Sequence, residues 1–117
     1  MTELRQPPAI EAFGNGGFRI EGERMEGSVL ILSDVVHSFS GQLTPLALAP
    51  VIAAGAAQVE LLILGMGRTL APPPRLVREA LQAAGIGLEP MTTAEAVRLY
   101  NLLASDGRRV AAALIAV

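Results

Sequence analysis

The chain contains no cysteine and no lysine among its 117 residues. Without cysteine it cannot form a disulfide, a thiolate nucleophile, a cysteine zinc site or an iron–sulfur cluster, and nothing ties it to an oxidising compartment. Without lysine it lacks the side chain with which a P-loop holds phosphates. Composition alone therefore excludes several classes of enzyme and cofactor protein.

Charge is scarce as well. The formal net charge is −2, and no run of basic residues is present. Proteins that bind nucleic acid or an anionic membrane surface usually carry a basic patch, so we expect neither kind of contact. Residues 1–8 hold charges and prolines where a secretory signal would be apolar, which predicts a cytoplasmic protein, and we expect these eight residues to be flexible.

The longest uncharged stretch covers residues 35–59. Its apolar part, residues 43–57, is shorter than the roughly 20 residues that a transmembrane helix needs, and it contains Pro45 and Pro50. We therefore expect no membrane span. Thr44 followed by Pro45 predicts a helix start, and Pro50 then requires either a short kinked helix or a single turn followed by a fresh start. Since this helix has no charged face, it is either buried on two sides or meets a partner.

The beginning of the chain predicts a β-hairpin. Residues 9–13 and 17–21 alternate in polarity around Gly14-Asn15-Gly16, which is typical of two strands with one buried face. We expect three large apolar side chains of this hairpin to face inward: Phe13, Phe18 and Ile20.

Two more strands follow after a break. The charged residues 22–26 predict a turn, residues 27–32 an apolar strand that Ser33-Asp34 ends, and residues 36–40 another alternating strand.

The second half alternates between strands and helices. Residues 59–64 are almost entirely apolar and are followed by two glycines, which predicts a strand buried on both faces in the middle of a sheet. Residues 74–84 form an amphipathic helix pattern that ends at Gly85, with Leu76, Val77, Ala80, Leu81 and Ala84 on its apolar face.

The C-terminal third predicts three more elements. Residues 86–91 read as an edge strand because they include Pro90. Thr92 and Glu95 match a capping box, which predicts a helix to about Ser105 that buries Ala96, Leu99, Tyr100 and Leu103. The uncharged residues 110–117 fit a helix or a strand, and their short length favours a closing strand.

These elements predict a single α/β domain over residues 1–117. We expect three layers, with a central mixed sheet, helices on its faces and an N-terminal β-hairpin addition.

The turn Gly65-Met66-Gly67 is the first candidate for a ligand site, since open α/β sheets bind ligands at the carboxyl ends of their strands. A dinucleotide fingerprint would need a third glycine where Leu70 stands, so glycines that merely allow a tight turn are the favoured interpretation. Arg68 beside them is a weaker candidate for holding an anion.

No other pattern indicates catalysis. His37 is the only histidine, no Gly-x-Ser-x-Gly sequence accompanies it, and Ser38 lies on the opposite face of its strand. The carboxylates Glu21, Glu23 and Glu26 cluster in the predicted turn without forming an acid–base pair. We therefore expect no catalytic residues, no metal site and no cofactor.

Three stretches carry a likeness to a known family: residues 62–67, which end in Gly65-Met66-Gly67; residues 91–103, which contain Met91-Thr92-Thr93 and Tyr100-Asn101; and residues 106–114, which begin Asp106-Gly107-Arg108-Arg109. The chain resembles the mitochondrial complex I assembly factor 3 family, which includes a bacterial domain-of-unknown-function branch and an adipogenesis-associated relative. Met66 stands where relatives often have threonine, which weakens a ligand role for that side chain, and Asp106 where they often have glutamate.

The resemblance implies a three-layer α/β fold with a mixed sheet. It also implies a non-catalytic role in assembling a membrane-associated respiratory complex, through protein partners met at the inner membrane.

The alternative is a small-molecule or anion-binding protein, or an enzyme, with a cleft at the glycine turn. Its candidate ligand-binding residues are Gly65, Gly67, Arg68, Met91, Thr92, Tyr100, Asn101 and Arg108. Structural hydrogen bonding is the favoured role of Asn101 and Arg108.

Overall fold

A computed structural model describes residues 6–117. Eight strands and three helices follow one another in this part of the chain. In chain order they are β1 (Ile10–Gly14), β2 (Gly17–Ile20), β3 (Glu23–Glu26), β4 (Ser28–Leu32), β5 (Val35–Phe39), α1 (Ala49–Ala54), β6 (Leu61–Gly65), α2 (Arg75–Ala83), β7 (Gly87–Met91), α3 (Thr93–Ser105) and β8 (Val110–Leu114). None of these helices is long and apolar enough to cross a membrane.

The main sheet has five strands in the order β5-β4-β8-β6-β7. β6 runs parallel to β7 and to β8, whereas β4 runs antiparallel to β5 and to β8, so the sheet is mixed. β6 is an interior strand, as predicted from its apolar run. The strand predicted to close the chain, β8, takes the central position, and its residues Ala111, Ala112 and Ala113 are fully buried.

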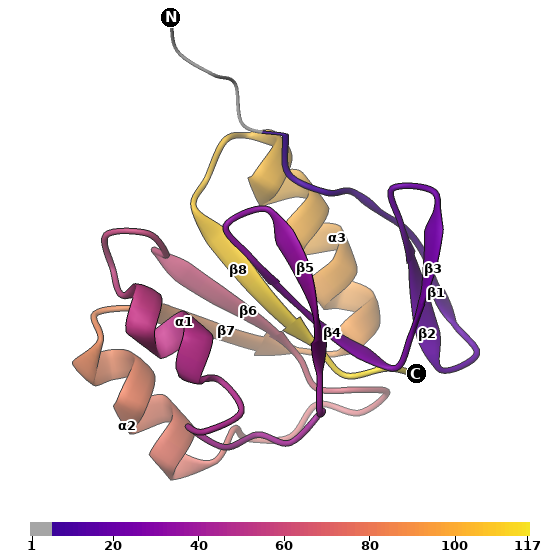
Figure 1. The fold of residues 1–117 in the computed structure, drawn as a ribbon. Helices are drawn as coiled ribbons and strands as arrows, with labels where there is room; N and C mark the ends of the chain where they lie inside the picture. Colours follow the sequence, from indigo (N-terminus) through magenta and orange to yellow (C-terminus); the bar gives the residue numbers. More distant parts are fainter. Residues whose placement is uncertain (1–5) are drawn as a thin grey trace, which may run out of the picture.

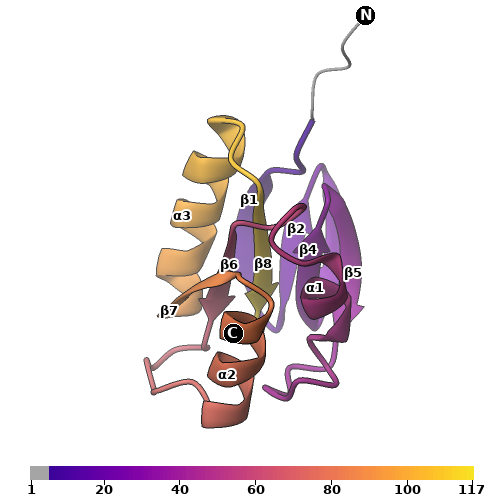
Figure 2. The ribbon, with the colours of Figure 1, turned by 90° about the vertical axis from the view of Figure 1, so that its left-hand side faces the viewer.

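Two layers cover the faces of this sheet, and the predicted fold class is confirmed. Figures 1 and 2 show α1 and α2 on one face and α3 on the other, with the small sheet β1-β2-β3 beside α3. The buried side chains form two clusters accordingly. Val51, Val77 and Leu81 belong to the cluster under α1 and α2, while Phe18 and Tyr100 belong to the cluster under α3 and the small sheet.

The N-terminal hairpin is confirmed, with two corrections. Residues 23–26 form strand β3, antiparallel to β2, where we expected only a turn. Their side chains are mostly exposed, so no alternation of apolar residues marked them, and the strand depends on backbone pairing at an edge. Phe13 does not face inward: it is 39% exposed, because it lies beside the hairpin turn and borders an open hollow.

The first described residues, which begin at residue 6, are tied to α3 through Pro8. Residues 1–5 of the predicted flexible start lie outside the described part. Pro8 is buried, and its carbonyl accepts a hydrogen bond of 2.9 Å from the Tyr100 hydroxyl.

The uncharged segment follows one of the two alternatives left by the sequence. A single turn comes first, in which the amide of Ala47 donates to Thr44 Oγ1 at 3.1 Å. α1 then begins at Ala49, with Pro50 in its first turn. The amides of the first turn have no acceptor within the helix, so the N–H that proline lacks costs no hydrogen bond there. The helix expected from Pro45 is therefore short and starts four residues later.

The remaining elements match their predictions closely. α2 ends before Gly85, whose φ of 75° suits the residue after a helix, and Pro90 lies in the edge strand β7. α3 begins with the predicted capping box of Thr92 and Glu95. The prediction that Leu76 lies on the buried apolar face is wrong, because its side chain is 64% exposed. Val77 and Leu81 supply the contact with the sheet, and Leu76 lies about 100° round the helix from Val77.

Candidate functional site

The glycine turn after β6 is held together from inside the protein. Thr93, the first residue of α3, is fully buried, and its hydroxyl accepts a 3.0 Å hydrogen bond from the Gly67 amide. The same hydroxyl donates to the Ile115 carbonyl at 2.7 Å. One side chain thus joins the ends of β6 and β8 to the start of α3.

Both glycines have a structural reason at this turn. A Cβ atom on Gly65 would lie 3.1 Å from the Thr93 Cα and 3.0 Å from a methyl carbon of Leu114. Gly67 has a φ of 98°, which side chains rarely allow. In addition, the Met66 amide donates to the Met91 carbonyl at 2.8 Å. The amides of Met66 and Gly67 are therefore both used within the chain.

A shallow hollow of about 260 Å³ lies outside this turn. Its lining residues are Phe13, Gly67, Arg68, Thr92, Ala94 and Val117. Arg68 is exposed, and its side chain has no hydrogen bond or ion pair with any residue from 6 to 117. Three candidate residues, Gly67, Arg68 and Thr92, thus border one hollow at the carboxyl end of β6.

The start of α3 already carries a negative group. The Glu95 carboxylate accepts a hydrogen bond of 2.8 Å from the Thr92 hydroxyl and one of 3.3 Å from the Thr92 amide. These two bonds, together with the charge of Arg98, lower the pKa of Glu95 from its ordinary value. A ligand anion at this helix end would have to compete with the protein's own carboxylate.

Two further candidates line the core. Gly65 is buried beneath Thr93, and Met91 is half-buried against the cluster under α3.

Tyr100 and Asn101 fasten α3 to the N-terminal segment. Besides the bond from Tyr100 to Pro8, the Asn101 side chain accepts from the Ile10 amide at 3.0 Å and donates to the Ile10 carbonyl at 2.9 Å. This pair of bonds imitates a strand pairing at the start of β1. Both side chains point to the packing between α3 and the small sheet, away from the hollow at Arg68.

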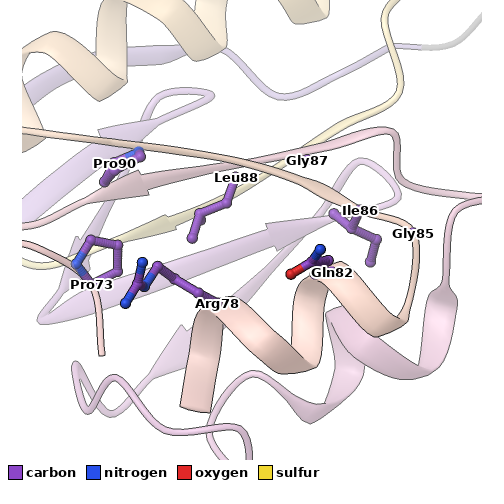
Figure 3. Close-up of a pocket in the computed structure, with 8 residues that line it drawn as sticks. All are labelled: Pro73, Arg78, Gln82, Gly85, Ile86, Gly87, Leu88 and Pro90. Carbon is purple, nitrogen blue, oxygen red and sulfur yellow. The ribbon is translucent and has the colours of Figure 1, made fainter. Parts of the chain in front are cut away.

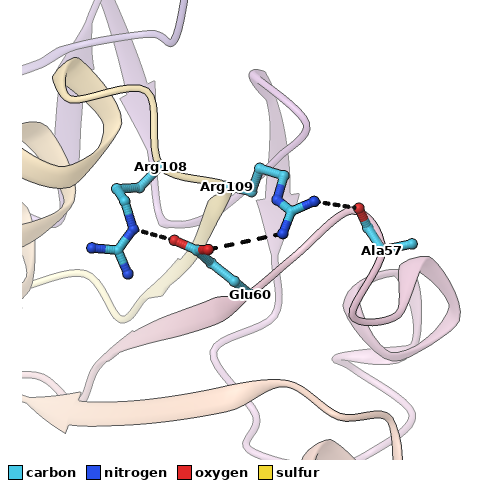
Figure 4. A network of polar contacts seen from close by, with 4 residues as sticks. All are labelled: Ala57, Glu60, Arg108 and Arg109. Carbon is cyan, nitrogen blue, oxygen red and sulfur yellow. Dashed lines mark hydrogen bonds and ion pairs between the residues drawn. The ribbon is translucent and has the colours of Figure 1, made fainter.

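Arg108 lies at the opposite end of the sheet, where β6 and β8 begin. Figure 4 shows Glu60 between two guanidinium groups: Arg108 donates to Glu60 Oε1, and Arg109 lies 3.9 Å from Glu60 Oε2. Arg109 also donates to the Ala57 carbonyl at 3.1 Å. The eight candidate residues therefore fall into separate groups, and no single concavity contains them all.

Thr93 is the residue that sequence reasoning missed. The capping-box pattern assigns roles to Thr92 and Glu95 and none to the two residues between them, Thr93 and Ala94. The signal in the sequence was a polar residue at the first position of the predicted helix. In the fold, this helix begins next to the two glycines of the turn. Between residues 6 and 117, no three His, Asp or Glu side chains gather closely enough to hold a metal ion.

Proteins from several bacteria are similar to this chain in sequence or in fold. Residues 10–115 match the family described as protein of unknown function (DUF498/DUF598). An uncharacterized protein of Rhodobacter capsulatus is 42% identical over 91% of this chain and 82% of its own length.

Two solved structures share the fold and part of the sequence. One is a protein of Bartonella henselae described as an outer membrane protein, with a TM-score of 0.89, 31% identity and coverage of 94% of this chain and 95% of that one. The other is the Rpa2829 protein of Rhodopseudomonas palustris, with a TM-score of 0.80, 38% identity and coverage of 99% and 90%. The family match spans every strand and helix described above, and the chain belongs to the DUF498/DUF598 family of proteins of unknown function.

Proposed function

We propose that the protein is a non-catalytic interaction protein that helps to assemble a membrane-associated complex, and that it docks through the outer side of α1 and the turn before it. The observation that carries this proposal is an exposed surface without charge. We call it the α1 surface and define it by four exposed residues: Leu46, Ala49, Pro50 and Ala53.

The α1 surface differs from the usual solvent side of a helix. Leu48 and Val51 are fully buried against the sheet, so these two side chains are the ones with which the segment packs onto the core. Leu46 on the outward side is nevertheless 86% exposed. A surface helix normally presents charged or polar residues to water, and an exposed apolar patch marks an interaction site. No charged residue occurs from 35 to 59, so nothing on the segment itself repels an apolar partner.

Two likenesses support a membrane-associated partner. The chain resembles the complex I assembly factor 3 family, whose role is to assemble the peripheral arm of a respiratory complex beside the inner membrane. A relative in Bartonella henselae is described as an outer membrane protein. These descriptions concern related proteins, and for this chain they support the proposal of a partner that belongs to a membrane-associated complex.

The test is affinity purification after mild crosslinking in the source cells. The wild-type protein should recover a component of a membrane-associated complex, with respiratory subunits as the first expectation. Leu46→Arg should abolish that recovery, because it places a charge at the most exposed large apolar side chain of the α1 surface. Leu102→Arg is the matched control, since Leu102 is 59% exposed on α3, on the other face of the sheet.

Both variants should keep the wild-type thermal midpoint, because both positions face solvent. Reproducible absence of any membrane-associated component, or equal recovery by Leu46→Arg, contradicts the proposal.

A second candidate function has one observation in its favour. The hollow beside Gly67 contains Arg68, a cation without a partner among residues 6–117, at the end of a sheet where α/β proteins bind ligands. Binding of a small anion there should raise the thermal midpoint, and Arg68→Ala should remove the effect. A screen of metabolite anions in which none stabilises the wild-type protein contradicts this function.

A further inference from the structure

A second, larger hollow lies between α2 and the edge strand β7, apart from the glycine turn. Its volume is about 470 Å³, within the range of small-molecule sites. Its lining residues, drawn in Figure 3, are Pro73, Arg78, Gln82, Gly85, Ile86, Gly87, Leu88 and Pro90. α2 supplies the polar side chains, while the apolar ones come from β7 and from Pro73 and Ile86 in the segments on either side of α2.

The polar wall consists of Arg78 and Gln82, which lie four residues apart and therefore on one face of α2. Arg78 is exposed, and its side chain makes no ion pair or hydrogen bond with any residue from 6 to 117. Its neighbour Arg75 differs, because Arg75 pairs with Glu79 at 3.0 Å. The hollow thus contains one uncompensated cation next to a neutral amide.

The apolar wall continues beyond this hollow. A neighbouring hollow of about 340 Å³ is lined by Leu70, Ala71, Pro72, Pro73 and Pro90. The two hollows share Pro73 and Pro90, so they lie next to each other, and we call the two together the groove. Leu70 in the second hollow is 55% exposed. The groove therefore has a polar end at Arg78 and an apolar end at Leu70.

The charges around the groove select the kind of ligand. Among residues 6–117, no carboxylate lines either hollow. Glu89 lies between Leu88 and Pro90 in β7, so its side chain points to the opposite face of the sheet. A single guanidinium beside a neutral amide balances one negative charge and presents a fork of donors that fits a carboxylate. A doubly charged phosphate would call for a second cation, which the lining residues do not supply.

The two glycines of the groove are explained without a ligand. Gly85 has a φ of 75° after α2, and a Cβ atom on Gly87 would lie 3.2 Å from a methyl carbon of Leu61. Only the unpaired Arg78, the adjacent Gln82 and the apolar extension remain to be accounted for.

We propose that the groove between α2 and β7 binds a small amphipathic monocarboxylate. The carboxylate lies against Arg78 and Gln82, and the apolar chain extends past Pro73 and Pro90 toward Leu70. This site is independent of docking through the α1 surface, which lies on other residues.

The test uses octanoate as the probe, with acetate as the head alone and 1-octanol as the tail alone, and follows backbone amide shifts by NMR. Octanoate should give saturable shifts at Gln82 and Leu88, with an affinity at least about fivefold higher than that of octanol or acetate. Arg78→Gln should weaken octanoate binding by about fivefold or more. The matched control Arg75→Gln should bind as the wild type does.

Three results overturn the proposal. The first is an absence of saturation by octanoate at about 10 mM, a level at which even weak sites fill. The second is equal affinity for octanoate and octanol, or equal loss in the Arg78→Gln and Arg75→Gln variants. The third is a set of shifts centred on Arg68 or Leu46. Both arginines are exposed, and amide spectra that match the wild type outside the groove establish that each variant is folded.

Discussion

The hydroxyl of Thr93 holds the glycine turn together, although the sequence around Thr93 does not reveal this role. It accepts a hydrogen bond from the Gly67 amide and donates one to Ile115, and it is fully buried. If the hydroxyl is removed, the Gly67 amide stays buried without a partner. A buried donor left unpaired costs more than the bond itself contributes.

Thr93→Val keeps the shape of the side chain and removes the hydroxyl. The free energy of unfolding should fall by about 1–3 kcal/mol, as for other buried donors that lose their acceptor. Urea denaturation measures this change, and Thr93→Ser, which keeps the hydroxyl, should lose clearly less. A Val variant as stable as the wild type would show that Thr93 does not hold the turn.

The lowered pKa of Glu95 predicts that the stability of the fold depends on pH. Its pKa is lowered in the folded protein by the hydrogen bonds from Thr92, so the carboxylate stabilises the fold above its ordinary pKa of 4.5. That stabilisation is lost as the pH falls below this value and through the lowered pKa. The urea midpoint of the wild type should therefore exceed that of Glu95→Gln at pH 7, and the difference should shrink on acidification. A difference that stays constant or grows below pH 4.5 contradicts this role.

At the scale of elements, the small sheet depends on α3 for its position. Asn101 joins the start of β1 through two hydrogen bonds to the Ile10 backbone. The sequence predicted the hairpin and α3 separately, because apolar periodicity and the Thr92–Glu95 pattern are local signals. It could not predict the joint between them, because the sequence favours structural hydrogen bonding for Asn101 but does not reveal that its partner is the Ile10 backbone.

Asn101→Ala should loosen this joint. Hydrogen exchange should become faster for the Ile10 amide and for the β1–β2 pairing, while β6 amides stay protected, because the variant removes contacts of the small sheet only. Ser105→Ala is the control, as the Ser105 hydroxyl bonds only to Leu102 within the same helix. Uniform acceleration over the whole chain would mean that the small sheet and the main sheet open together.

At the scale of the whole molecule, the order of the strands in the main sheet could not be predicted from the sequence. The layers, the mixed sheet and the interior place of β6 could be read from apolar runs and the turns between them. The central place of β8 could not, because Ala111, Ala112 and Ala113 fit a helix as well as a strand and their small side chains suggest no burial by themselves. Their complete burial follows from contacts with β4 and β6, which are distant in sequence.

The candidate site was predicted less well than the fold. As an alternative, sequence reasoning offered eight residues for one cleft, while structural hydrogen bonding was the favoured role of two of them, Asn101 and Arg108. The structure places Tyr100 and Asn101 against the N-terminal segment and Arg108 at the far end of the sheet. Which end of a strand or which face of a helix a residue occupies depends on the direction of neighbouring strands, and no local pattern records that direction.

Enlarging the centre of the sheet should destabilise the entire fold. Ala112→Leu adds a side chain where β8 is fully buried, and overpacking of this kind typically costs about 1–3 kcal/mol. Thermal and urea unfolding measure the loss. Ala53→Leu makes the same substitution at an exposed position and should leave stability within about 0.5 kcal/mol of the wild type. Equal stability of the two variants would mean that the layers around β8 adjust freely.

The most direct test of the central claim is photo-crosslinking from the α1 surface in the source cells. A benzophenone amino acid in place of Leu46 should form a covalent adduct with a component of a membrane-associated complex, whereas the same probe in place of Leu102 should form none. Adducts of equal yield from both positions, or no adduct from position 46, would contradict docking through the α1 surface.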